Sequence, residues 1–133
     1  MDFEYIESKI LEWEKALNTF KRAIDTEGIN ELERDGAIQR FEYCFELSWK
    51  VLKIVINDQN SVEILTPKEA FKKAFKTGLI DNEIIWDDIL KKRNVSVHTY
   101  VESLAKSLFE LLPSYYERMN WSLQNIKKIY DIK

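Results

Sequence analysis

Hydrophobic side chains recur along this chain at steps of three and four residues, the spacing that places them on one face of an α-helix. The first stripe predicts a helix over residues 2–26 and the second a helix over residues 31–57, with Gly28 and Asn30 interrupting the pattern between them. Their apolar positions are Phe3, Ile6, Ile10, Trp13, Leu17, Phe20 and Ile24, then Leu32, Ile38, Phe41, Phe45, Leu47, Trp49, Leu52 and Ile56.

A short third helix is predicted over residues 67–77 by the residues at its two ends. Thr66 is placed to cap its N-terminus and Glu69 to complete a capping box, while Pro67 suits the first helical turn. Gly78 supplies the left-handed residue that commonly closes a helix.

Two further helices follow. Asp81 or Asn82 caps the fourth, which ends by delivering Arg93, and the C-terminal arm is helical to about residue 130, with Pro113 as a candidate kink. Their stripes are Ile85, Trp86, Ile89 and Leu90, then Tyr100, Leu104, Leu108, Leu111, Leu112, Tyr116, Trp121, Leu123, Ile126 and Ile129.

The pattern contains no strand alternation, no tandem repeat and no low-complexity segment. A length of 133 residues suits one domain, and 45% hydrophobic with 32% charged residues is typical of a helical protein rather than a disordered one. The sequence therefore predicts an all-α fold, an up-and-down antiparallel four-helix bundle with one short extra helix, as a single domain over residues 1–133.

The net charge, the single cysteine and the N-terminal sequence limit the classes of function that the chain can have. The net charge of −3 gives no global basic field, so any RNA contact must be local. Cys44, the only cysteine, has apolar neighbours and is expected to be buried rather than nucleophilic. Neither an export signal nor an apolar run of membrane-spanning length is visible, so we expect a cytoplasmic protein without a membrane partner.

Aromatic residues make up 13% of the chain, which is more than one small bundle core can cover. Apolar surface left exposed in this way favours a homodimer.

Glu42 and Glu46 lie four residues apart on one face of the predicted second helix. Paired carboxylates can bind a divalent metal, but no His, Cys or third acid stands beside them at helical spacing. With Arg40, Lys50 and Lys53 nearby, ion pairs are the favoured interpretation, and no metal or other cofactor is predicted.

The segment from Lys91 to Tyr100 holds the candidate chemistry, including His98, the only histidine. Arg93 and His98 are five residues apart, which on one straight helix would separate them by roughly 140°. A helix break must therefore bring them together. Taken alone, Arg93 and Asn94 would be a helix-terminus arrangement, His98 a satisfied histidine and Tyr100 a half-buried aromatic.

This pattern of Arg-Asn, three residues, His, one residue and Tyr resembles the signature of the HEPN family, in its branch of nucleotidyltransferase substrate-binding proteins. Three segments carry the resemblance, namely 41–53, 66–80 and 86–100. Val101 departs from the branch, in which a polar residue is expected after the tyrosine.

The resemblance implies a homodimeric helical bundle that assembles with a minimal nucleotidyltransferase, in pairs that resemble toxin–antitoxin systems. It implies that Arg93 is the catalytic cation, Asn94 its polar companion, His98 the base and Tyr100 the phenol that the transferase adenylylates.

Three functions stay open at this point. The chain is a partner subunit that presents a bound substrate or Tyr100, or a metal-independent ribonuclease silenced by modification of Tyr100, or a structural bundle with a vestigial motif. For cleavage, His98 would take the 2′-hydroxyl proton and Arg93 would stabilise charge on phosphorus, while a dimer would add the missing acid. Lys91 and Lys92 would form a basic lip for RNA. The sequence shows no Gly-Ser and paired-Asp nucleotide site, so the chain is not itself expected to be the transferase.

Overall fold

The computed structural model describes residues 2–60 and 62–133. Within these residues the chain forms α1 (Phe3–Ile24), α2 (Glu31–Asn60), α3 (Pro67–Lys76), α4 (Glu83–Val95) and α5 (Glu102–Ile129), with one turn of 3-10 helix, η1 (Ser96–His98), between α4 and α5. The described residues contain no β-strand. The predicted all-α fold is confirmed.

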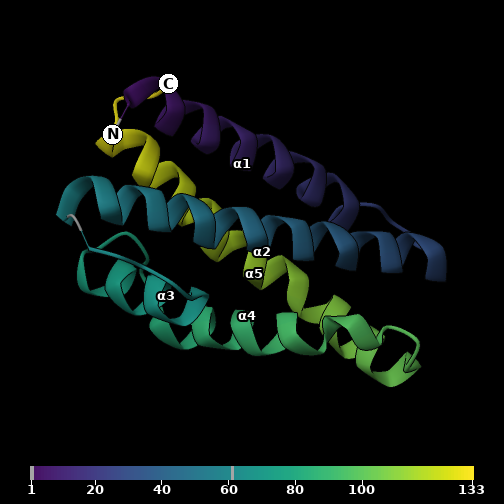
Figure 1. Ribbon diagram of the computed structural model, residues 1–133. Helices are drawn as coiled ribbons and strands as arrows, with labels where there is room; N and C mark the ends of the chain where they lie inside the picture. Colours follow the sequence, from purple (N-terminus) through teal and green to yellow (C-terminus); the bar gives the residue numbers. More distant parts are fainter. Residues whose placement is uncertain (1, 61) are drawn as a thin grey trace.

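The second helix lies at the centre of the bundle. α2 packs against α1, α3, α4 and α5, while α1 also packs against α5, and α3 against α4. The four long helices α1, α2, α4 and α5 run in alternate directions, with α3 as the short extra helix (Figure 1). The two ends of the chain lie side by side, and the ring of Phe3 is 6.3 Å from that of Tyr130.

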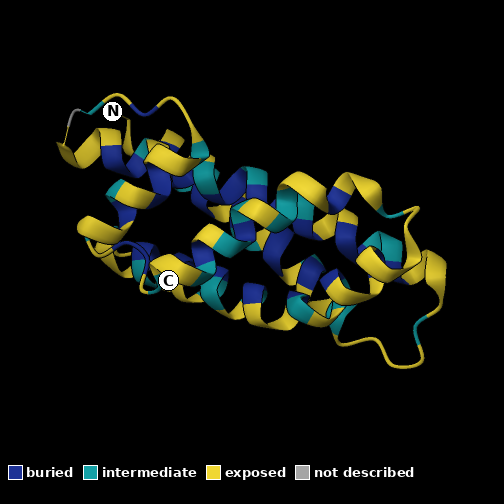
Figure 2. Cartoon of the chain, turned by 90° about the horizontal axis from the view of Figure 1, so that it is seen from below, coloured by how far each residue is buried: buried dark blue, intermediate teal, exposed yellow. Residues whose placement is uncertain are grey.

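The core is built from the apolar stripes of all five α-helices, which face inward (Figure 2). Trp13, Trp86 and Tyr115 are its largest fully buried side chains. Several stripe positions, mostly near helix ends, are instead exposed, because no helix covers them there: Phe3, Leu32, Phe75, Leu104, Trp121 and Ile129.

The helix ends follow the predicted chemistry closely. Thr66 Oγ1 accepts the Glu69 amide at 3.2 Å, and Glu69 reaches back to the Leu65 amide rather than to that of Thr66. Asn82, not Asp81, caps α4, and Gly78 adopts a φ of +79° after α3. These caps fix where α4, and therefore the motif at its far end, begins.

Two helix boundaries differ from the sequence prediction, the end of α2 and the start of α5, which begins at Glu102 and leaves Tyr100 of the predicted stripe outside the helix. α2 runs on through Asn60, past residue 57 where the predicted helix ends; residues 58–61 were expected to form a loop, of which 58–60 are helical and Ser61 lies outside the described residues. α5 is one continuous helix with Pro113 inside it.

Throughout the described residues, no helix combines the length and apolar character needed to cross a membrane.

Candidate functional site

The motif lies where α4 gives way to α5. α4 ends at Val95, two residues after Arg93, and His98 closes the 3-10 turn that follows. The Val101 amide then donates to the His98 carbonyl at 2.9 Å, immediately before α5 begins. The helix break that the sequence required is therefore present, and it changes the chain direction within a few residues.

Arg93 points toward α2. Its Nη1 lies 3.5 Å from Glu42 Oε2 and its Nη2 lies 3.8 Å from Glu46 Oε1. The predicted ion pairs of these carboxylates are present, but their partner is Arg93, across the bundle, rather than a basic neighbour on α2. A phosphate that approaches Arg93 must compete with two carboxylates.

Ser96 is a site residue that the sequence analysis missed. Its Oγ lies 2.5 Å from Glu42 Oε2 and 2.8 Å from the Arg93 carbonyl oxygen, so the hydroxyl can donate to either acceptor. The side chain is buried. Glu42 therefore holds both Arg93 and the turn that carries His98, and only a contact between distant segments could reveal this.

His98 and Tyr100 form a pair on the outside of this turn. His98 Nδ1 and Tyr100 Oη are 2.9 Å apart, and the two rings meet edge to face at 5.5 Å. Tyr100 is 79% exposed. When Nδ1 carries no proton, the phenol donates to it, and the imidazole is then placed to accept the phenol proton.

Asn94 is exposed beside Arg93 at the end of α4. The two lysines before it are each paired with an aspartate one turn earlier: Lys91 with Asp87 at 3.1 Å and Lys92 with Asp88 at 3.0 Å. Their charges are therefore partly neutralised within α4.

Asp88 also accepts a hydrogen bond from the hydroxyl of buried Tyr115 on α5. Burial raises the pKa of the Asp88 carboxyl, but the hydrogen bonds from Tyr115 and Lys92 outweigh it, so that this pKa lies below its usual range. This network fixes α4 against α5 one turn before Lys92.

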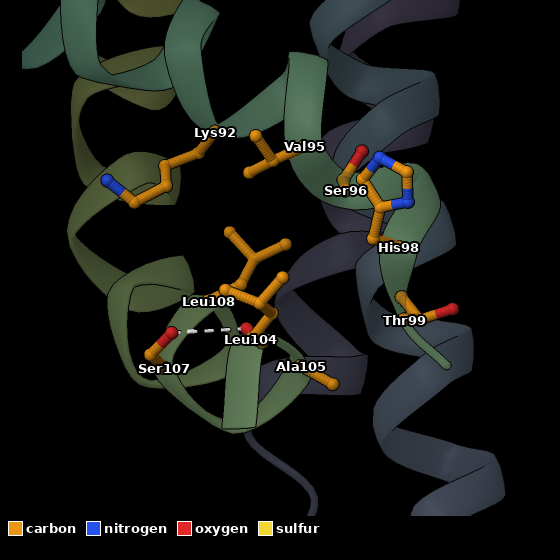
Figure 3. Close-up of a pocket in the computed structure, with 9 residues that line it drawn as sticks. All are labelled: Lys92, Val95, Ser96, His98, Thr99, Leu104, Ala105, Ser107 and Leu108. Carbon is orange, nitrogen blue, oxygen red and sulfur yellow. Dashed lines mark hydrogen bonds between the residues drawn. The ribbon is translucent and has the colours of Figure 1, made fainter. Parts of the chain in front are cut away.

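A small cavity of about 40 Å³ adjoins the motif (Figure 3). In the view of Figure 3, Lys92 and His98 lie on opposite sides of it, with Leu104 and Leu108 of α5 between them. This space is far below the several hundred Å³ of an ordinary small-molecule site. One chain alone therefore does not enclose a nucleotide here.

The sequence also raises the Cys44 thiol as a candidate nucleophile and the pair of Glu42 and Glu46 as a candidate metal site. Cys44 is fully buried, and burial raises the pKa of its thiol to about 12, which keeps the thiol protonated and inert. In the described part of the chain, no group of three or more His, Cys, Asp or Glu side chains is arranged to hold a metal ion.

The chain is similar in sequence and in fold to several known proteins. A curated relative from Haemophilus influenzae, described as a probable ribonuclease HepT, is 25% identical over 97 residues; the match covers 70% of this chain and 66% of the relative, just under two thirds of its length. A crystal structure of a protein from Thermus thermophilus is 36% identical, with a TM-score of 0.82 over 86% of this chain and 98% of that one.

A second solved structure, from Haemophilus influenzae, has a TM-score of 0.68 at 20% identity and covers 95% of this chain and 99% of that one. It is described as revealing the fold of a substrate binding domain of a nucleotidyltransferase, so the fold is shared. The family model described as nucleotidyltransferase substrate binding protein like matches residues 8–128. Because that match spans nearly the whole bundle, the chain belongs to this family of nucleotidyltransferase substrate-binding-like proteins.

Proposed function

We propose that this chain is the helical partner subunit of a minimal nucleotidyltransferase and that it presents Tyr100 as the acceptor of a nucleotidyl group. The observation that carries this proposal is the 2.9 Å contact between His98 Nδ1 and the hydroxyl of a 79% exposed tyrosine. A phenol that stands clear of the surface can reach a partner's active site, and a histidine beside it can activate it. Family membership supports the identity of the partner.

The transfer step follows from this geometry. Tyr100 Oη attacks the α-phosphorus of ATP bound by the transferase, forming a phenol–phosphorus ester. The bond between the α-phosphorus and the bridging oxygen breaks, pyrophosphate leaves, and the phenol proton passes to His98 Nδ1. A cytoplasmic location fits this chemistry, since ATP is available there.

A homodimer built around the motif is part of the proposal. Apolar side chains next to His98 are exposed, notably Val97 at 59%. Others in the same stretch are Val95, Val101 and Leu104. Several exposed apolar side chains within one short segment are typical of an interface, and a second copy would enlarge the small cavity beside His98 into a cleft.

A second candidate function is metal-independent RNA cleavage, which would make the chain the toxin half of a toxin–antitoxin pair. It is favoured by the placement of Arg93 and His98 on either side of the helix break, and by the relative described as a probable ribonuclease. In a dimer, one His98 takes the 2′-hydroxyl proton and the other donates to the leaving 5′-oxygen, while Arg93 stabilises charge on phosphorus. Nucleotidylation of Tyr100 would then block His98.

Two measurements test these functions separately. Co-purification with the transferase, followed by transfer of label from α-labelled ATP, tests the acceptor role, with Tyr43→Phe as a control because Tyr43 is also exposed. Cleavage of RNA in the presence of EDTA, lost in His98→Ala, tests the ribonuclease role. Unchanged cleavage by His98→Ala would rule out this mechanism.

A further inference from the structure

A groove between α1 and α2 lies outside the motif and has no role in the functions above. It offers about 370 Å³ of space, enough for a nucleotide-sized group. Two aromatic residues, Tyr5 and Trp49, stand in its walls, and three lysines, Lys9, Lys50 and Lys53, surround them. Aromatic faces beside ammonium groups are what a single nucleic-acid strand requires, because bases stack and phosphates pair.

The groove is locally basic in an acidic chain. Lys9 is paired with Glu12 at 3.4 Å, but Lys50 and Lys53 have no ion-pair partner among residues 2–60 and 62–133. The Lys53 ammonium lies over the half-buried Trp49 ring, 5.9 Å from its centre, so a base that stacks on this face displaces the ammonium toward the phosphates. Lysines left without carboxylate partners are available to phosphate groups.

The groove connects to the motif along one face of α2. Glu46 contacts Arg93 through Oε1 and accepts the Trp49 indole N–H at 3.2 Å through Oε2. Trp49, Lys50 and Lys53 follow Glu46 at steps of three, four and seven residues, the spacing of one helix face. At 1.5 Å per residue, Lys53 lies about 10 Å along the helix from Glu46, a distance that two or three nucleotides span.

We propose that this groove binds single-stranded RNA beside the scissile phosphate, with Trp49 stacking on a base and Lys50 and Lys53 pairing with phosphates. The inference rests on the ribonuclease activity proposed above and extends it by naming the surface that holds the nucleotides next to the cleaved bond. A duplex is disfavoured because its base faces are covered and cannot reach Trp49.

The test measures binding of a short, fluorescein-labelled single-stranded RNA by anisotropy, in a His98→Ala background that prevents cleavage. Two groove variants are compared, Trp49→Leu and the double variant Lys50→Gln/Lys53→Gln. Their matched controls are Trp121→Leu on α5 and Lys68→Gln/Lys72→Gln on α3, which alter exposed residues of the same types elsewhere. Cleavage by the parent chain with His98 intact is assayed in parallel.

Trp49→Leu is expected to weaken binding of the single strand about tenfold and to leave binding of a duplex unchanged. The double lysine variant is expected to weaken it by a similar factor and to reduce the slope of log K against log salt by roughly 1.4, at about 0.7 per phosphate contact. The control variants should bind like the parent.

Each other outcome contradicts the inference in a distinct way. If the parent cleaves RNA but the groove variants bind RNA as well as their controls do, the groove does not bind RNA, and the proposed ribonuclease function is unaffected. If only the lysine variant weakens binding, Trp49 does not stack, and the groove is a general anion surface. If the parent neither binds nor cleaves RNA, the groove and the ribonuclease function both fail.

Discussion

Glu42 on α2 and Arg93 on α4 form an ion pair with 3.5 Å between Oε2 and Nη1, and the same carboxylate oxygen lies within hydrogen-bonding distance of Ser96 Oγ. One side chain of the central helix thus holds the candidate cation and the turn that leads to His98. The geometry of the motif therefore depends on α2 as well as on its own segment.

Replacing Glu42 by Ala should lower the free energy of unfolding by about 2 kcal/mol, because Arg93 and Ser96 both lose a charged partner in a partly buried place. Glu42→Gln should cost less, since the amide oxygen still accepts from Ser96. Denaturant unfolding measures both values.

The matched control for this prediction is Glu46→Ala. Glu46 lies 3.8 Å from Arg93, is more exposed than Glu42 and also accepts the Trp49 indole N–H, so its loss should cost about 1 kcal/mol, less than the loss of Glu42. Equal losses for the two glutamates would show that Glu42 does not hold the turn in place.

The Asp88 network predicts a specific dependence of stability on pH. Because the pKa of Asp88 is lowered in the folded chain, its contribution is present above the unfolded pKa of about 3.9 and is lost as the pH falls through the folded value. Asp88→Asn should therefore be less stable than the parent at pH 7, and the difference should shrink in acid. Tyr115→Phe should cost about 1–2 kcal/mol at pH 7. A stability difference between the parent and Asp88→Asn that does not change with pH would contradict the lowered pKa of Asp88.

The dimer proposal predicts that Val97→Glu disrupts association, because a two-fold axis near the motif would bring like charges together in an apolar interface. Light scattering should give a dimer mass for the parent and a monomer mass for the variant at micromolar concentration. Ile84→Glu, which changes an 83% exposed residue at the other end of α4, should remain dimeric. If the parent protein itself is monomeric, the proposed dimer interface does not exist.

His98→Gln tests the role of the imidazole in the transfer to Tyr100. The variant keeps a polar side chain but cannot act as a general base near neutral pH, so the rate of nucleotidyl transfer should fall by roughly 100-fold. The complex with the transferase should still form. A rate equal to that of the parent would mean that the transferase itself takes the phenol proton.

The fold could be predicted from the sequence because its determinants are local. The three-and-four spacing of apolar residues set the helices, and Thr66, Asn82 and Gly78 set their ends with short-range hydrogen bonds and backbone geometry. Leu32 shows the limit of periodicity: it continues a stripe but is 82% exposed, because the stripe extends past the neighbouring helices.

The site was predictable only where its residues are neighbours in sequence. The helix break followed from the spacing of Arg93 and His98 within one segment, whereas the contact between His98 and Tyr100 was not predicted. The pairing of Arg93 with Glu42 joins residues far apart in the chain, so spacing contained no signal for it. The same holds for the α1–α2 groove, because Tyr5 and Lys9 of α1 meet Trp49 of α2 only through packing.

The most direct test of the central claim is the intact mass of this chain after co-expression with the transferase and supply of ATP, alongside Tyr100→Phe and Tyr43→Phe. The proposal predicts added nucleotidyl mass on the parent and on Tyr43→Phe, and none on Tyr100→Phe. A stable complex with no added mass on any chain, or with the mass retained in Tyr100→Phe, would contradict the proposal that Tyr100 is the acceptor.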